Sequence, residues 1–143
     1  MLALMIGTIG ENATLKRAFC YKVQRGMIHL AGYAHPSGSE LNDIHFGKFG
    51  AIMAFRQYVQ EEVDLNLLGK DLCQHIVGMN PKFLGSSEFE PADKNEDEES
   101  LLHQEYLLDE TITVADFLSN NGIEVLDFKR FQCGELSSES GSR

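Results

Sequence analysis

Long apolar runs are missing from this chain of 143 residues. A helix that crosses a membrane needs roughly 20 consecutive apolar residues, and no segment comes near that length. Residues 1–6 are apolar, but no basic segment precedes them as in a secretory signal, and no Arg-rich amphipathic leader like a mitochondrial import signal precedes the fold. We therefore expect a water-soluble protein that makes no membrane contact.

Cysteine is scarce and irregularly placed. Cys20, Cys73 and Cys133 are odd in number and widely separated, and no pair has the Cys-x-x-Cys spacing of a zinc or redox site. Neither a disulfide framework nor a zinc knuckle is indicated. The pattern is typical of a protein in a reducing compartment.

Positive charge is also scarce. The chain has 12 Lys and Arg against 22 Asp and Glu, which gives a formal net charge of −10. A nucleic-acid groove needs clustered Lys and Arg, and the field of this chain would repel phosphates. We therefore predict no nucleic-acid partner and favour a protein partner.

The length is typical of one domain, since chains of this size bury roughly two-thirds of their unfolded surface. We assign residues 1–135 to a single domain. Within it, residues 85–100 are dominated by Glu, Asp and Ser, and such a segment cannot bury enough surface to order itself. We predict a mobile acidic loop at 85–100 and a disordered polar tail at 136–143.

Alternating and β-branched residues predict a small antiparallel sheet. Residues 19–23 alternate apolar and polar, a turn at 24–26 follows, and residues 27–34 are rich in β-formers, which together predict a hairpin. A polar loop at 35–43 leads to a third strand at 50–55. Residues 123–133 predict a further strand, whose alternation slips between Val125 and Leu126 and indicates a bulge.

Two helices are predicted between these strands. Asp64 is a suitable N-cap for a helix that ends before Pro81, because proline disfavours the helical conformation of the residue before it. One apolar stripe runs along this helix, made of Leu65, Leu68, Leu72, Ile76 and Met79. Thr113 and Asp116 form a capping-box pattern for a short second helix that Gly122 ends. We predict an α+β fold, with the long helix packed on one face of the sheet and the short helix alongside.

Three separated blocks of the sequence form a recognisable set. They are Ile-Gly-Thr-Ile-Gly-Glu-Asn at residues 6–12, His-Ile-Val-Gly-Met-Asn-Pro at 75–81, and Asp-Phe-Lys-Arg-Phe-Gln-Cys-Gly-Glu at 127–135. Together they resemble the elongation factor Ts family, and the similarity runs from about residue 2 to residue 135. Gly-Tyr-Ala-His at 32–35, Gly-Lys-Phe-Gly at 47–50 and Leu-Asp-Glu-Thr-Ile-Thr-Val at 108–114 follow in the order of that family, with Glu110 where proline is usual.

Two features resemble the mitochondrial branch of the family. Only a short acidic stretch separates Pro81 from Leu101, where many bacterial members carry a long helical dimerisation insertion, and the hairpin from residue 35 to residue 49 is enlarged. The resemblance therefore implies a protein of the mitochondrial matrix. Without the dimerisation insertion, we expect a monomer that forms a 1:1 complex with its partner.

The resemblance implies a translation factor that is not an enzyme and needs no cofactor. Such a guanine-nucleotide exchange factor binds mitochondrial elongation factor Tu, promotes GDP release and so regenerates the GTP form. Family members carry upstream a small helical domain and a Thr-Asp-Phe-Val motif, whose Asp-Phe pair disturbs the magnesium and phosphate site of the GTPase. This chain begins too late to include them, so we expect a mature or truncated product that binds weakly and exchanges poorly. The alternative is a docking module that only binds elongation factor Tu.

The resemblance also implies a partner-binding surface, formed by Tyr33, His35, Phe49, Gly50, His75 and Gly78. By helical periodicity His75 lies at the boundary of the apolar stripe, and Gly78 lets another backbone approach. The residues alone also fit a second interpretation, which for His75 is the one they favour before the resemblance is considered. In it, His75 is a half-buried histidine bonded within its own domain, and Phe49 is a core aromatic before a glycine that the loop geometry requires.

Catalysis and metal binding are the weaker alternatives. A hydrolase would pair Asp71 with His75 and use Cys73 as the nucleophile, but Cys73 points about 200° away from His75 on the same helix. We predict instead that Cys73 is a small core residue. Neither catalytic nor metal-binding residues are assigned.

The possible metal ligands lack the required spacing. The acidic stretch at 88–99 does not have the pattern of a calcium loop. Three histidines could converge across the hairpin but have no Cys or carboxylate partner at short spacing, namely His29, His35 and His45.

Overall fold

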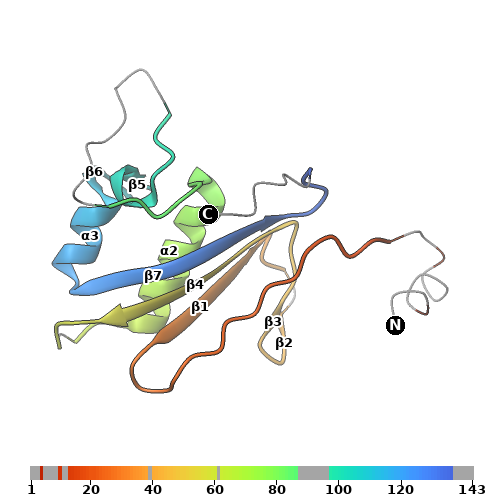
Figure 1. Ribbon diagram of the computed structural model, residues 1–143, viewed down its shortest axis with the longest axis horizontal. Coiled ribbons are helices and arrows are strands. Elements are labelled where there is room, and N and C mark those ends of the chain that lie inside the picture. The colour runs from red at the N-terminus through yellow and green to blue at the C-terminus, as the bar shows by residue number, and fades with distance from the viewer. Residues whose placement is uncertain are drawn as a thin grey trace.

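The computed structural model describes residues 4, 10, 13–38, 40–60, 62–86 and 97–136. Figure 1 shows a sheet with one long helix against it and a smaller helix at its end. This arrangement confirms the predicted α+β fold. The elements are β1 (His29–His35), β2 (Glu40–Leu41), β3 (Ile44–His45), β4 (Phe49–Gln57), α2 (Leu65–Met79), the short 3₁₀-helix η1 (Leu101–His103), β5 (Glu105–Tyr106), β6 (Asp109–Thr113), α3 (Val114–Asn120) and β7 (Ile123–Gln132).

The central sheet has three antiparallel strands in the order β1-β4-β7. β4 pairs with β1 from Phe49 opposite His35 onward, and its other edge pairs with β7. Between Ala54, opposite Asp127, and Phe55, opposite Val125, the register shifts by one residue. The extra residue is Leu126, which confirms the predicted bulge.

The core lies between the sheet and α2. Side chains alternate between the two faces of a strand, and the buried residues of β4 include Met53 and Phe55, both almost fully covered. α2 packs them against Leu72 and Ile76, which are fully buried. Each such side chain contributes about 1.5–3 kcal/mol when buried, so this face of the sheet holds the domain together.

Both helices begin and end close to the predicted residues. Asp64 accepts a hydrogen bond from the Leu67 N–H, and α2 ends at Met79 because Asn80 adopts the left-handed conformation before Pro81. Thr113 and Asp116 form a reciprocal capping box at the start of α3. Among the described residues, no helix is long and apolar enough to span a membrane.

The predicted strand at 19–23 is wrong. Residues 13–24, here called the strap, form no strand and run beside the sheet as an extended coil (Figure 1). Alternate side chains of the strap contact alternate residues of β7: Tyr21 donates a hydrogen bond to Asp127, and the Lys129 ammonium lies over the Phe19 ring. Alternation correctly indicated an extended segment with two faces, but it cannot specify whether the backbone pairs with a neighbouring strand.

Two loop predictions also need correction. Within the predicted loop at 35–43, residues 40–41 pair with residues 44–45 as β2 and β3, through a turn in which Asn42 and Asp43 both have positive φ. The acidic loop was placed at 85–100, yet Ser100 is buried and pairs with Phe83. Residues 87–96 and 137–143, which include most of that loop and nearly all of the predicted tail, lie outside the described residues.

Candidate functional site

Three of the six candidate residues form an aromatic cluster where β1 ends and β4 begins. Tyr33 and His35 lie on the same face of β1, and the Tyr33 hydroxyl is 3.2 Å from Nδ1 of His35. His35 is opposite Phe49 in the β1–β4 pairing, and their ring centroids are 6.4 Å apart. His35 is exposed and the other two are partly exposed. The sheet therefore presents this cluster to solvent at one end.

Arg130 supports the cluster from β7. Its guanidinium carbon lies 5.5 Å from the centroid of the Phe49 ring, a cation–π contact. The same guanidinium donates to the carbonyl oxygen of Val77 near the end of α2 and, through Nη1, to Gln132. No motif of the sequence singles out Arg130. Its period-2 position on β7, facing α2 together with Phe128, was the signal that could have identified it.

Gly50 belongs to the opposite face of the sheet. It is paired with Ala34 on one side and Phe131 on the other, and a Cβ atom on it would lie 3.6 Å from the carbonyl oxygen of Tyr33. A cleft of about 480 Å³ opens beside it. The walls of this cleft come from the strap (residues 14–17), the segment around the start of β4 (residues 47–50) and the end of β7 (residues 131–135), with Ala34 and His45.

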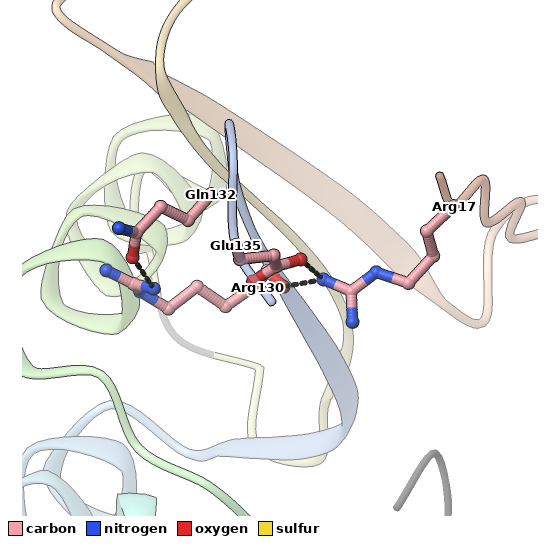
Figure 2. Close-up of polar contacts among 4 residues, drawn as sticks. All are labelled: Arg17, Arg130, Gln132 and Glu135. Carbon is pink, nitrogen blue, oxygen red and sulfur yellow. Dashed lines mark hydrogen bonds and ion pairs between the residues drawn. The ribbon is translucent and has the colours of Figure 1, made fainter. Parts of the chain in front are cut away.

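Arg17 ties the strap to β7 at this cleft. Its Nη2 atom donates to the backbone carbonyl of Arg130 and to the carboxylate of Glu135, and its guanidinium lies over the Phe131 ring. Figure 2 shows Arg17 reaching Glu135 and the Arg130 backbone, while the Arg130 side chain extends away from it toward Gln132. The end of β7 is thus held by arginines on both faces.

His75 occupies a different position from the one predicted. It is not a boundary residue but is fully buried, because η1 and β5 cover that side of α2. The Leu107 N–H donates to Nδ1 at 3.1 Å, so Nε2 carries the proton and donates to Oε1 of Gln104 at 2.9 Å. Gln104 in turn donates to the backbone carbonyls of Met79 and Glu98.

Burial lowers the pKa of His75, and the hydrogen bond to Gln104 offsets this only in part. The neutral ring therefore joins α2 to the segment that follows the acidic loop. Both of its nitrogens are engaged, which leaves no base for Cys73. The Cys73 thiol is buried as predicted, and burial raises its pKa to about 12.

Gly78 is exposed and follows this network on α2. A Cβ atom there would lie 3.3 Å from the Leu107 side chain, closer than most such contacts. Leu107 itself is held by its N–H bond to His75. The last turn of α2 thus lies between the aromatic cluster and the His75 network. Val77 binds Arg130, which contacts Phe49. Gly78 lies against Leu107, which binds His75.

Comparison with known proteins agrees with the resemblance stated from the motifs. A family model described as Elongation factor TS matches residues 1–100. The mitochondrial elongation factor Ts of Aedes aegypti is 48% identical over 139 residues, covering 94% of this chain and 44% of the relative. The corresponding Drosophila melanogaster protein is 43% identical, over 97% of the chain and 44% of the relative. The human protein is 40% identical, over 94% of the chain and 41% of the relative.

The chain thus spans less than half the length of these curated relatives. All three are named as mitochondrial proteins, which supports the mitochondrial localisation implied by the resemblance. The identity extends over nearly the whole chain, and the fold is the predicted one. This chain belongs to the elongation factor Ts family of translation elongation factors and resembles its mitochondrial members.

Proposed function

We propose that this chain binds mitochondrial elongation factor Tu as a guanine-nucleotide exchange factor, forming a 1:1 complex that promotes GDP release and regenerates the GTP form. Exchange by binding requires that the chain bind the nucleotide-free partner more tightly than the GDP form. No covalent chemistry is needed. Membership of the elongation factor Ts family supports the choice of partner.

The observation that carries the proposal is the aromatic cluster of Tyr33, His35 and Phe49. Partly exposed aromatic side chains that are held rigidly lose little conformational entropy on binding and are frequent anchors of protein interfaces. Arg130 holds Phe49 in place, so the cluster is preorganised. Gly50 contributes backbone to the same end of the sheet.

His75 and Gly78 enter the proposal in different roles. Gly78 is exposed and can be approached directly. The buried ring of His75 instead positions Leu107 and the end of α2, which border Gly78. A His75 variant should therefore reduce partner affinity together with stability, rather than partner affinity alone.

The test measures binding and exchange separately. Calorimetry gives the affinity of the chain for mitochondrial elongation factor Tu, and stopped flow follows release of a fluorescent GDP analogue from the partner as the chain is titrated to saturation. Binding with acceleration supports the exchange function. Binding without acceleration assigns these residues to the docking module alone, and no binding contradicts the proposal.

A matched pair of variants tests the surface. We expect Phe49→Ala to weaken binding by about tenfold or more, the effect of removing one aromatic anchor. Tyr58→Ala is the control, because Tyr58 is an exposed aromatic just past the other end of β4. Equal weakening by both variants, with unchanged circular dichroism, would remove the cluster from the interface.

A further inference from the structure

The cleft beside Gly50 has the opposite charge to the rest of the molecule. Its lining contains Lys16, Arg17 and Lys48 and a single carboxylate, Glu135, in a chain whose Asp and Glu outnumber Lys and Arg by 22 to 12. Arg17 is paired with Glu135. Within the described part of the chain, the ammonium groups of Lys16 and Lys48 form no ion pair. Among the residues that the structure describes, nothing therefore compensates these two positive charges of the cleft.

Backbone contacts fix the β4 and β7 walls of the cleft, and the Arg17 side chain holds the strap wall. The Cys133 N–H donates to the Lys48 carbonyl at 2.7 Å, which extends the pairing of β4 and β7 to the residue before β4. Gly47 crosses so close to β1 that a Cβ atom would lie 2.7 Å from the His35 backbone. Lys16 is next to Arg17, which is anchored to β7. The backbone position of Lys48 is therefore set before a ligand arrives, and the side chain of Arg17 holds the neighbouring strap against β7.

We propose that this cleft receives a carboxylate-rich segment of the protein partner. This inference rests on the function given above and specifies the chemistry of the interface with that partner. Lys16 and Lys48 supply the charge that pairs with Asp or Glu side chains of that segment. Phe49 and Gly50, which also line the cleft, place the segment at the end of the sheet that carries the aromatic cluster, on the opposite face.

The surroundings of the cleft favour a protein over a nucleic acid. The β2–β3 hairpin, whose His45 lines the cleft, exposes Leu41, Ile44 and Phe46 with 62%, 51% and 55% of each residue accessible. Apolar side chains beside paired charges are typical of protein interfaces. A long phosphate backbone would also extend beyond the cleft, where the negative field of a chain with net charge −10 would repel it. A short acidic segment would stay inside the cleft, and because salt screens distant charges it would interact mainly with the nearby lysines.

The first experiment tests the cleft without elongation factor Tu. A short poly-glutamate peptide is titrated into the 143-residue chain while backbone amide resonances are followed. We expect shifts at residues 47–50 and 133–135 in the wild type and none in the double variant Lys16→Glu/Lys48→Glu. The control, Lys22→Glu/Lys70→Glu, makes the same change in net charge at exposed positions outside the cleft lining and should behave as the wild type.

The second experiment measures affinity for mitochondrial elongation factor Tu. We expect Lys16→Glu/Lys48→Glu to bind about tenfold more weakly than the control at about 0.05 M salt, and less than about twofold more weakly at about 0.5 M salt, where surface charges are screened. Competition by the peptide should follow the same salt dependence.

The outcomes separate the cleft from the proposed function. Peptide shifts without binding of elongation factor Tu support the cleft and contradict the proposed function. Absent shifts in the wild type, or equal affinity of both double variants for elongation factor Tu, overturn the cleft and leave that function standing. Tighter binding of an RNA oligonucleotide than of the peptide at the same amides overturns the assignment to an acidic protein segment.

Discussion

Arg130 donates from Nε and Nη2 to the carbonyl oxygen of Val77, at 3.3 and 3.2 Å. In a continuing helix that oxygen would accept from the N–H four residues later, but residue 81 is Pro81 and has none. Arg130 therefore replaces the missing donor, and its charge lies at the negative end of the helix dipole. Because Pro81 has no N–H, the carbonyl oxygen of Val77 is left available to Arg130. The guanidinium of Arg130 thus joins α2 to β7 and also contacts Phe49.

Replacement of Arg130 should test this link. We expect Arg130→Ala to lower the free energy of unfolding by about 2 kcal/mol, because a charge-assisted bond is lost and the described residues offer the Val77 oxygen no other donor. Arg130→Lys should recover only part of this, since an ammonium cannot reproduce the forked contact. Urea unfolding followed by circular dichroism measures both.

The control for Arg130 is Arg56→Ala. Arg56 forms an ion pair with Glu124 on the surface, where both side chains are about half exposed, and such pairs contribute about 0–1 kcal/mol. If both alanine variants cost the same, Arg130 has no special role at the end of α2.

His75 should make the stability depend on pH. Burial lowers its pKa in the folded state below the ordinary value of about 6.5, so the unfolded chain takes up a proton at a higher pH than the folded chain. The contribution of neutral His75 is complete above about pH 7 and is lost as the pH falls from about 6.5 toward the lowered pKa. Protonation of Nδ1 would also abolish its bond from the Leu107 N–H.

Urea unfolding at about pH 7.5 and about pH 5.5 measures this dependence. We expect the free energy of unfolding of the wild type to be lower at the acid pH. His75→Asn should be less stable at pH 7.5 but should respond less to pH. Hydrogen bonds from Thr111 and Thr113 lower the pKa values of Asp109 and Asp116. These two carboxylates do not affect the comparison, because they titrate below about pH 4. Equal stability of the wild type at both pH values would contradict the lowered pKa of His75.

Gly69 lies where α2 packs tightly against the sheet. A Cβ atom there would lie 2.6 Å from the Cβ of Ala31 and 3.2 Å from Cε1 of Phe55. Helix propensity favours alanine over glycine by about 1 kcal/mol, but overpacking costs about 1–3 kcal/mol. We expect Gly69→Ala to destabilise the domain by up to about 2 kcal/mol, measured as a lower thermal midpoint.

Gly38→Ala is the matched change, because a Cβ atom at Gly38 would meet nothing within 4 Å. It should leave the midpoint unchanged or raise it slightly, through the reduced entropy of the unfolded chain. A Gly69→Ala variant as stable as Gly38→Ala would mean that α2 can move away from β1 at little cost.

The three thiols should differ in reactivity. Cys20 and Cys133 are exposed, whereas Cys73 is buried with a raised pKa of about 12, and only the thiolate reacts at an appreciable rate. We expect a thiol reagent at neutral pH to modify Cys20 and Cys133 within minutes and Cys73 only after unfolding in urea. Peptide mass spectrometry identifies the modified positions. Rapid modification of Cys73 in the native chain would show that α2 opens from the sheet.

Local sequence signals determined most of the elements. Asp64, Thr113 and Asp116 provide caps that act within one helical turn, and Asn80-Pro81 ends α2 for a steric reason that needs no distant contact. The slip in alternation at Leu126 predicted a bulge, because a side-chain period of two fixes which face each residue occupies. The sequence was also sufficient to identify the family, because the family's motifs are short stretches of sequence that can be recognised without a structure.

Tertiary structure decided which of these elements meet, and therefore the site. Periodicity placed His75 at a boundary, but η1 and β5, which follow the acidic loop, return to cover it. Alternation at residues 19–23 predicts a strand, yet the strap contacts β7 through its own side chains and does not pair with it. Arg130 could be assigned to a face of β7 but not to Val77 or Phe49. Local signals are short-range, whereas burial, charge pairing and the cleft depend on contacts between residues far apart in the chain, and a single sequence does not encode those contacts as a pattern.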